Sequence, residues 1–164
     1  MEDLKSYIED VHDFPKEGII YKDIQSLFED AGAFYEMIGG MTKLVDLTKV
    51  DYFVGIESRG FILASAIAVS TISGFKMIRK KGKLPDKNYE IVSLEYNLEY
   101  GTDTMQMKPG KGNVIIVDDV YATGGTMEAA EKLCKMAGYN VIDTICLLDV
   151  GIKQNHNVKC LITY

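Results

Sequence analysis

The chain has 164 residues and a mass of 18.3 kDa, which is the size of one compact domain and excludes two large ones. Hydrophobic residues make up 47% of the chain and charged residues 26%, a composition that excludes a disordered or low-complexity protein. The 18 basic and 24 acidic residues give a net charge of −6, which disfavours general binding to nucleic acid or to an anionic membrane surface. We therefore expect residues 1–164 to fold as a single domain with neither kind of partner.

The sequence also predicts a cytoplasmic protein. Met1–Lys5 lacks the basic and then apolar order of a secretion signal, and the longest apolar run, Phe61–Val69, is shorter than the roughly 20 residues that span a bilayer. Cys134, Cys146 and Cys160 are odd in number, widely spaced and without a CxxC pair, which disfavours a disulfide framework and a zinc site. We expect all three to be buried, reduced thiols.

The N-terminal pattern is typical of two amphipathic helices joined by an irregular loop. Apolar residues repeat at helical spacing over Leu4–Val11 and again over Phe34–Val45. Between them, Phe14–Asp23 has no period and is punctuated by proline and glycine. We expect an ordered loop with extended residues there, rather than a helix or a strand.

From Tyr52 onward, short apolar runs alternate with helical patterns. Continuous apolar runs are typical of strands buried on both faces, so the alternation predicts a doubly wound α/β fold with a mainly parallel sheet flanked by helices. In such sheets ligands bind beyond the carboxyl ends of the strands. The expected strands are Tyr52–Ile56, Phe75–Arg79, Asn113–Val117 and Val141–Leu148, and the expected helices are Gly60–Thr71 and Thr126–Ala137.

A long insert, Lys80–Gly112, interrupts this alternation. It contains a stretch of alternating apolar and polar residues, Tyr89–Tyr96, and a polar remainder rich in glycine, threonine and methionine. Inserts of this length in compact domains are usually functional. We expect residues 80–112 to act as a lid over the ligand.

The strongest functional signal is the run Val114–Thr126, in which a buried strand leads into a loop of small residues and then a helix. Asp118 and Asp119 bring two adjacent carboxylates to the edge of the sheet. The free N–H groups and the positive dipole end at the start of a helix suit a phosphate group, and glycines permit close approach of the backbone. The plainer alternative is a capped helix preceded by solvated acids.

The two arginines of the chain occupy special positions. The sequence has 16 lysines but only Arg59 and Arg79 as arginines. Arg59 stands at a helix start, where the helix dipole disfavours a cation, and Arg79 opens the basic run Arg79–Pro85. Because arginine binds phosphate through two parallel hydrogen bonds, this placement favours a pyrophosphate site over solvated surface charge.

The Val114–Thr126 motif resembles that of the type I phosphoribosyltransferases, which bind phosphoribosyl pyrophosphate (PRPP). The resemblance implies that fold, and it implies that Asp118 and Asp119 meet the ribose hydroxyls and stabilise the cation that develops at C1′ as pyrophosphate leaves. It also implies Mg²⁺ as the cofactor, held mainly by PRPP and water, with the two aspartates available as ligands. The residues expected to hold the 5-phosphate of PRPP, or the phosphate of AMP, are Ala122, Thr123, Gly124, Gly125 and Thr126.

Other motifs are similar to those of the adenine phosphoribosyltransferase family. They are Asp13–Asp23, Glu57–Phe61, Arg79–Pro85 and Leu98–Gly101. The resemblance implies a small N-terminal hood within residues 1–35, where the backbone N–H and C=O of Ile20 complement the amine and ring acceptor of adenine. Lys22, which stands where the family commonly has arginine, is included as an adenine contact.

The same resemblance assigns roles to the remaining site residues. Glu99 handles the purine proton as N9 becomes bonded, and Tyr100 belongs to the mobile lid loop. The expected catalytic residues are Glu99, Asp118, Asp119 and Arg59, and the expected pyrophosphate ligands are Arg59, Arg79, Lys80 and Lys83.

The resemblance implies an enzyme that converts adenine and PRPP to AMP and pyrophosphate, and it implies a homodimer. One alternative is a phosphoribosyltransferase for guanine, hypoxanthine or xanthine. A second is a PRPP-sensing regulator, which would not need the loop glutamate or the pyrophosphate cations. A third is a receiver-type domain that accepts a phosphoryl group on Asp118 or Asp119, which the glycine loop disfavours.

Overall fold

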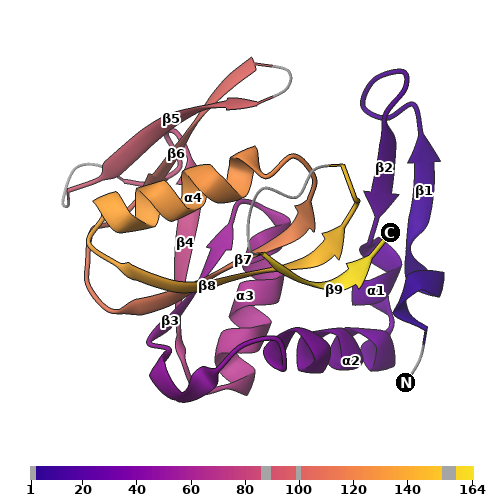
Figure 1. Cartoon of the computed structure of the whole chain (residues 1–164), viewed down its shortest axis with the longest axis horizontal. Coiled ribbons are helices and arrows are strands. Elements are labelled where there is room, and N and C mark those ends of the chain that lie inside the picture. The colour runs from indigo at the N-terminus through magenta and orange to yellow at the C-terminus, as the bar shows by residue number, and fades with distance from the viewer. Residues whose placement is uncertain (1–2, 86–89, 99–100, 153–157) are drawn as a thin grey trace. The chain divides into compact units, whose positions relative to one another are not determined.

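The computed structural model describes residues 3–85, 90–98, 101–152 and 158–164 (Figure 1). The chain divides into two compact units, Met1–Gly40 and Met41–Tyr164, and each is described by itself. That residues 1–164 form a single domain stays a prediction. No helix within the described ranges is both long and apolar enough to cross a membrane.

The N-terminal unit begins with short elements rather than the predicted helix over Leu4–Val11. A 3₁₀ helix, η1 (Leu4–Tyr7), is followed by strand β1 (Glu9–His12), which pairs antiparallel with β2 (Ile20–Asp23). The helix prediction was wrong because the backbone of β1 finds its hydrogen-bond partners in β2. For the same reason, the predicted loop over 14–23 is a loop only up to Ile19, and its last four residues form β2.

The turn between β1 and β2 is closed by Asp13, whose carboxylate accepts a hydrogen bond from Gly18 N at 2.8 Å. Asp13 and Gly18 both have positive φ, 57° and 84°. After β2 come α1 (Gln25–Glu29) and α2 (Ala31–Thr42), and α2 confirms the second predicted helix with its start three residues earlier than Phe34. A short 3₁₀ helix, η2 (Leu47–Lys49), precedes the sheet of the second unit.

Seven strands of the described residues form the sheet of the C-terminal unit, in the order β5-β6-β4-β3-β7-β8-β9. The strands from β4 to β9 in this order run parallel, and the β5–β6 hairpin joins β4 antiparallel at one edge. The bounds are β3 (Tyr52–Ile56), β4 (Gly74–Lys80), β5 (Val92–Leu98), β6 (Gly101–Met107), β7 (Asn113–Tyr121), β8 (Asn140–Asp149) and β9 (Lys159–Thr163). The prediction of a doubly wound, mainly parallel α/β fold is confirmed.

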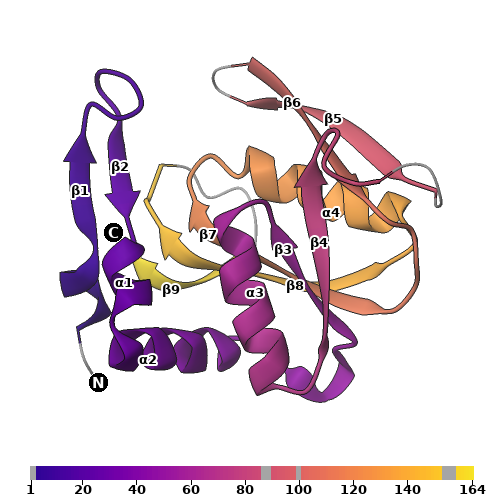
Figure 2. The same cartoon turned by 180° about the vertical axis from the view of Figure 1, so that it is seen from behind.

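Two helices cover this sheet from opposite sides. Helix α4 (Gly125–Met136) lies in front of the sheet in Figure 1, and α3 (Arg59–Ser70) lies in front in the reverse view of Figure 2. Under α4, Ala130 and Leu133 are buried in one cluster with Ile116 of β7. Each helix starts within one residue of its predicted start, because the apolar spacing that defines it is local in the sequence.

Strand β7 is longer than the predicted Asn113–Val117. It continues to Tyr121 because β8 pairs with it along its whole length, and Asp118 lies opposite Cys146. Asp118 and Asp119 are therefore strand residues rather than residues of the following loop. Strand β9, which pairs with the far side of β8, was not predicted.

The cysteines depart in one respect from the prediction. All three are free thiols, and Cys134 and Cys146 are fully buried, but Cys160 on the edge strand β9 is only partly buried. An edge strand has a neighbour on one side only, so its side chains are less completely covered.

Candidate active site

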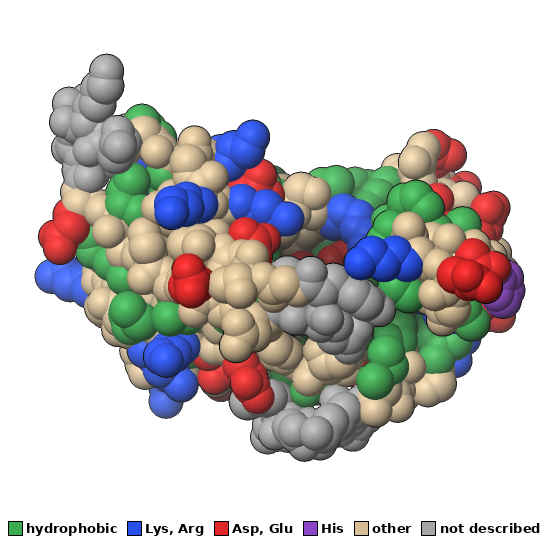
Figure 3. Space-filling view, turned by 90° about the horizontal axis from the view of Figure 1, so that it is seen from above, with side chains coloured by type: hydrophobic (Ala, Val, Ile, Leu, Met, Phe, Trp, Pro, Cys, Tyr) green, Lys and Arg blue, Asp and Glu red, His purple; other side chains and the backbone are tan. Residues whose placement is uncertain are grey.

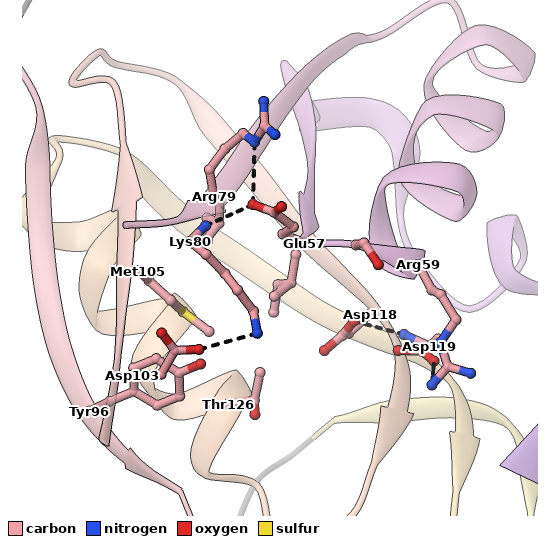
Figure 4. A pocket seen from close by; sticks show the side chains of 13 residues that line it. Glu57, Arg59, Arg79, Lys80, Tyr96, Asp103, Met105, Asp118, Asp119 and Thr126 are labelled. Carbon is pink, nitrogen blue, oxygen red and sulfur yellow. Dashed lines mark hydrogen bonds and ion pairs between the residues drawn. The ribbon is translucent and has the colours of Figure 1, made fainter. Parts of the chain in front are cut away.

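A cavity of about 290 Å³ opens at the carboxyl ends of the parallel strands, where the sequence predicted a ligand (Figure 4). Its walls come from the ends of β3, β4 and β7, the first residues of α3 and α4, and the β5–β6 hairpin. The lining residues are Ile56, Glu57, Ser58, Arg59, Ile78, Arg79, Lys80, Tyr96, Asp103, Met105, Asp118, Asp119 and Thr126.

The carboxylates of Asp118 and Asp119 form the buried floor of the cavity. Each residue is only 8% exposed, and Asp118 Oδ1 accepts a hydrogen bond from the backbone N–H of Asp119 at 3.0 Å. Burial, followed by the charge of Asp119, raises the pKa of Asp118 well above its usual value. This pair can therefore stabilise positive charge, and Asp118 can exchange a proton under milder conditions than an exposed aspartate.

Arg59 provides the nearest cation to this pair. Its Nη2 lies 2.5 Å from Oδ2 of Asp119. That oxygen is buried and accepts no hydrogen bond within the described part of the chain, so the contact is an ion pair without hydrogen-bond geometry. A ligand hydroxyl or a cation would have to displace Arg59 to reach this buried oxygen.

Gly60 explains how Arg59 comes so close. A Cβ added to Gly60 would lie 2.8 Å from the carbonyl oxygen of Val117 and 3.1 Å from Oδ1 of Asp118. Only glycine lets the first turn of α3 pack directly against the end of β7. The glycine in the Glu57–Phe61 motif thus sets the distance between its arginine and the aspartates.

Glu57 organises the basic end of β4. Its Oε2 accepts hydrogen bonds from Nε of Arg79 at 3.3 Å and from the backbone N–H of Lys80 at 2.8 Å. Burial raises the pKa of Glu57, but these two hydrogen bonds and the nearby positive charges outweigh it, so the pKa lies below its usual value. Figure 4 shows the Arg79 guanidinium on the far side of Glu57 from Asp118.

The β5–β6 hairpin contributes two residues that sequence reasoning missed. Nζ of Lys80 lies 3.4 Å from Oδ2 of Asp103, and Tyr96 lines the same wall (Figure 4). The pKa of Tyr96 is raised to about 12, mainly by burial and to a smaller extent by the negative charges of Asp103 and Asp118. The alternating pattern that ends at Tyr96 was a usable signal, because it predicts a strand with one face inward, but nothing local marks Asp103.

The predicted phosphate loop surrounds a second, smaller cavity of about 60 Å³ next to the first. Gly124, the residue before α4, has φ 86°, a left-handed conformation that favours glycine. A Cβ there would lie 2.9 Å from the hydroxyl of Tyr121. Lining this cavity are Asp118, Val120, Tyr121, Ala122, Thr123, Gly124, Thr126 and Met127.

The hydroxyl of Tyr121 is buried and has no hydrogen-bond partner among the described residues. An unpaired buried hydroxyl is costly, and this one lies beside the helix start that suits a phosphate. Gly125, the fifth residue of the predicted phosphate-binding set, begins α4 and is not in the lining of either cavity.

The remaining predicted site residues are described by the elements that carry them. Lys83 is exposed in the turn after β4 and is not in the lining of the larger cavity, although its charge helps to lower the pKa of Glu57. Ile20 and Lys22 lie on β2 in the N-terminal unit, where Nζ of Lys22 pairs with Asp10 at 2.7 Å. Glu99 and Tyr100 lie outside the described residues.

Comparison with known proteins identifies the family. Residues 25–164 match the phosphoribosyl transferase domain family. A relative from Bdellovibrio bacteriovorus named adenine phosphoribosyltransferase is 52% identical over 167 residues, which cover 99% of each chain. The chain belongs to the adenine phosphoribosyltransferase family. A family member from Hydrogenovibrio crunogenus is 50% identical and covers 90% of this chain and 85% of its own.

Solved structures of this enzyme family have the same fold. Adenine phosphoribosyltransferase from Thermoanaerobacter pseudethanolicus is similar with a TM-score of 0.90 and 36% identity, covering 99% of each chain. The Saccharomyces cerevisiae enzyme, complexed with an imino-altritol bisphosphate and adenine, has a TM-score of 0.87 and 33% identity, covering 98% of this chain and 97% of its own. The type I phosphoribosyltransferase fold predicted from the sequence is therefore confirmed.

Proposed function

We propose that the protein transfers the phosphoribosyl group of PRPP to N9 of adenine, forming AMP and pyrophosphate, with Mg²⁺ as the cofactor. The observation that carries the proposal is the convergence of three groups at the end of β7. Two buried carboxylates, the Arg59 guanidinium and the phosphate loop at the start of α4 line adjoining cavities. They match the charges of the C1′ cation, the pyrophosphate and the 5-phosphate, respectively.

The 5-phosphate of PRPP would bind at residues 122–126. The N–H groups at the start of α4 and the hydroxyls of Thr123 and Thr126 are donors suited to an anion. The unpaired hydroxyl of Tyr121 beside Gly124 would supply one more donor to a phosphoryl oxygen. Asp118 lines both cavities, which suits a ribose that joins the two ends of PRPP.

The pyrophosphate would bind among Arg59, Arg79, Lys80 and Lys83. Three of these cations, Arg59, Arg79 and Lys80, pair with the acids Asp119, Glu57 and Asp103, respectively. These pairs hold the cations in place before the substrate arrives, and an incoming pyrophosphate then competes with the acids for them. The partial exposure of Arg59 and Arg79, 29% and 28% of their side chains, leaves donors accessible.

The residues at the cavity fit Mg²⁺ only in combination with the substrate. Among the described residues no three or more His, Cys, Asp or Glu side chains gather into a metal site. Mg²⁺ is commonly bound by one or two carboxylates together with substrate phosphates and water, and the adjacent carboxylates of Asp118 and Asp119 in the lining of the larger cavity suit this arrangement. When bound, the ion would neutralise negative charge on the leaving pyrophosphate.

The protein's own groups would handle the base and the proton. We propose that Ile20 and Lys22 contact adenine from the N-terminal hood, that Glu99 takes the purine proton, and that Tyr100 belongs to the lid. Bases bound by relatives support the base assignment, because the Saccharomyces cerevisiae structure holds adenine and the Giardia lamblia structure holds 9-deazaadenine. Water must be kept from C1′, since the cation there would otherwise be hydrolysed.

A panel of bases tests the proposed reaction. Adenine, hypoxanthine, guanine and xanthine are each offered with PRPP and Mg²⁺, and AMP or the other nucleotide is measured. We expect turnover with adenine alone and loss of turnover when Mg²⁺ is chelated. Turnover of hypoxanthine but not adenine would contradict the base assignment, and PRPP binding without any turnover would favour the regulator.

A double variant tests the roles of the carboxylates. Asp118→Asn with Asp119→Asn should reduce kcat at saturating PRPP by at least about a hundredfold, because both negative charges next to C1′ are lost. Asp143→Asn is the matched control, since Asp143 lies on β8, pairs with Lys159 and does not line the cavity. A double variant with full turnover would contradict the mechanism.

We further propose that the enzyme is a homodimer and works in the cytoplasm, as the family resemblance implies. Sedimentation equilibrium of the purified chain gives the oligomeric state directly. A single species of 18.3 kDa at enzymatic concentration would contradict the dimer.

A further inference from the structure

Asp118, Cys146 and Cys160 lie in one row across three neighbouring strands. Asp118 of β7 is the register partner of Cys146 of β8, and Cys146 is the register partner of Cys160 of β9. Register partners in a sheet project their side chains to the same face. Two thiols are therefore adjacent, and the deeper one lies next to a carboxylate of the candidate active site.

The two thiols differ in accessibility. Cys146 is fully buried, whereas Cys160 is partly exposed on the edge strand. The thiol of Cys146 donates a hydrogen bond to the sulfur of Cys160, and this bond lowers the pKa of Cys160 below the usual cysteine value. Cys160 is thus the more acidic and the more accessible of the two thiols, and both properties favour reaction at Cys160.

Cys134 provides an internal contrast. It lies on α4, is fully buried, and its pKa is raised to about 12, first by burial and then by the charge of Glu131. A buried thiol with a raised pKa is inert toward exchange. Cys146 is also fully buried, and burial raises its pKa well above the usual cysteine value, so on its own it is equally unreactive. It differs from Cys134 in its register partner, the more accessible Cys160.

We propose that Cys146 and Cys160 are a reversible oxidation site, where a low-molecular-weight disulfide such as glutathione disulfide converts the two thiols into one intramolecular disulfide. The Cys160 thiolate attacks one sulfur of the small disulfide, forms a mixed disulfide and releases one thiolate. The sulfur of Cys146 then loses its proton, attacks the sulfur of Cys160 and releases the second thiolate. Two protein thiols are oxidised, and one small disulfide is reduced to two thiols.

The strand geometry permits this bond with a small movement. Neighbouring strands lie about 4.7–4.9 Å apart, within the roughly 4.4–6.8 Å range of Cα separations that disulfides span, although the Cβ atoms must approach to about 3.5–4.5 Å. Strand β9 has five residues and only one neighbouring strand. It is therefore the side of the pair that can shift.

The bond should also affect catalysis, an expectation that rests on the proposed function. Strand β9 takes most of the movement, but the new bond also pulls on Cys146, and Asp118 is the residue next to Cys146 on the other side. Misplacement of a catalytic group by about 1 Å can cost up to a hundredfold in rate. We expect the oxidised protein to have a kcat/KM for PRPP at least about threefold below that of the reduced protein.

The test compares the folded wild-type protein with the variants Cys134→Ala and Cys160→Ser. Each protein is treated with glutathione disulfide and then denatured, and its free thiols are alkylated with iodoacetamide. Mass spectrometry of the intact proteins then counts the alkylated thiols. In the wild type and in Cys134→Ala, the protein mass should fall by two hydrogen atoms, and two thiols should no longer react with iodoacetamide. Trypsin should then release the peptides 136–153 and 160–164 as one linked species that dithiothreitol separates. Cys160→Ser should form no linked species.

Two results would overturn the proposal: all thiols of the wild type staying open to alkylation, or a mixed disulfide with glutathione that never resolves. Activity measured on the same samples tests the coupling to Asp118, and a fully crosslinked protein with unchanged kcat/KM would overturn that coupling. Because the crosslink is read by mass, its absence is distinguishable from a failure of the proposed function, in which the reduced protein makes no AMP.

Discussion

Tyr121 is a single side chain whose buried hydroxyl predicts its role. Its hydroxyl lies beside Gly124 and is buried without a hydrogen-bond partner in the described part of the chain. A hydrogen bond to a charged phosphoryl oxygen is worth about 1.5–3 kcal/mol, so Tyr121→Phe should weaken binding of AMP by about tenfold or more. Isothermal titration calorimetry with AMP measures this change.

The same substitution should not destabilise the ligand-free protein, because it removes an unsatisfied hydroxyl rather than a hydrogen bond. Adenosine, which lacks the phosphate, is the control ligand, and its affinity should stay the same. A lower melting temperature of the ligand-free variant together with unchanged AMP affinity would assign Tyr121 to packing alone.

Glu57 gives the site a pH-dependent contribution to stability. Its pKa is lowered in the folded protein, so its hydrogen bonds to Arg79 and Lys80 stabilise the fold above the unfolded-state pKa of about 4.3. This stabilisation is lost as the pH falls through the folded-state pKa. Glu57→Gln should therefore cost about 1–2 kcal/mol at pH 7, and the difference from wild type should shrink below about pH 4.

Urea unfolding at several pH values measures this difference. Glu131→Gln is the control, because Glu131 forms an ion pair on the surface of α4 with Lys135, and the Lys135 side chain is 61% exposed. Such surface pairs contribute about 0.5 kcal/mol or less to the free energy of unfolding. If the difference in the free energy of unfolding between Glu57→Gln and wild type stays constant from pH 7 to below pH 4, the charge of Glu57 is not responsible for it.

At the level of elements, the β5–β6 hairpin supplies a wall of the cavity. It pairs with the end of β4 at Arg79 and Lys80, and Asp103 of β6 holds the Lys80 side chain. Asp103→Asn should release Lys80 for pyrophosphate and remove a charge that repels it. Because exposed ion pairs are worth about 0.2–1 kcal/mol, we expect the KM for PRPP to fall by about two- to fivefold in steady-state assays.

Asp143→Asn again serves as the control, because it breaks the ion pair with Lys159 between β8 and β9 away from the cavity. Its KM for PRPP should match that of wild type. If Asp103→Asn instead raises the KM, Asp103 positions Lys80 for the substrate rather than withholding it.

Some helices and strands were not predicted correctly from the local sequence pattern. The pattern over Leu4–Val11 is helical, yet Glu9–His12 forms β1 because β2 offers it backbone hydrogen bonds. Similarly, β7 extends to Tyr121 because β8 continues beside it. In both cases a strand partner decides the outcome, and strand partners lie at sequence distances that periodicity does not report.

At the scale of the whole molecule, charge is unevenly distributed. The stretch Lys76–Lys83 contains five of the 18 basic residues and no acid, which leaves 13 basic against 24 acidic residues elsewhere, a balance of −11. Figure 3 shows basic and acidic side chains next to one another on one face of the molecule. Because the net charge of the protein would repel the polyanionic PRPP, we expect the basic stretch Lys76–Lys83 to provide the local attraction for this substrate.

Ionic strength should separate the two substrates. Screening shortens from about 30 Å at 0.01 M salt to about 8 Å at 0.15 M, so the KM for PRPP should rise by about threefold or more over this range. The KM for adenine, which is neutral, should hardly change. Initial rates measured in potassium chloride provide the comparison, and an equal rise in both constants would contradict steering by the basic region.

Several parts of the site were predictable because they are local in sequence. The glycine-containing loop after Tyr121, the paired aspartates and the arginine at the start of α3 each lie within a short motif. Glu57 lies inside such a motif too, but its role became visible only through its bonds to Arg79 and Lys80. Tyr96 and Asp103 enter the site through the register of the β5–β6 hairpin on β4.

The sequence alone determined the alternation of strands and helices, the glycine-containing loop before α4 and the family resemblance. Each depends on residues within a few positions of one another, where spacing and residue type set the backbone conformation. Only the tertiary structure decided which acid pairs with which cation and how far β7 extends. It also decided that Cys146 and Cys160 are neighbours in the same row of the sheet as Asp118. Strand order and register decide these contacts, and both arise from pairing between distant segments.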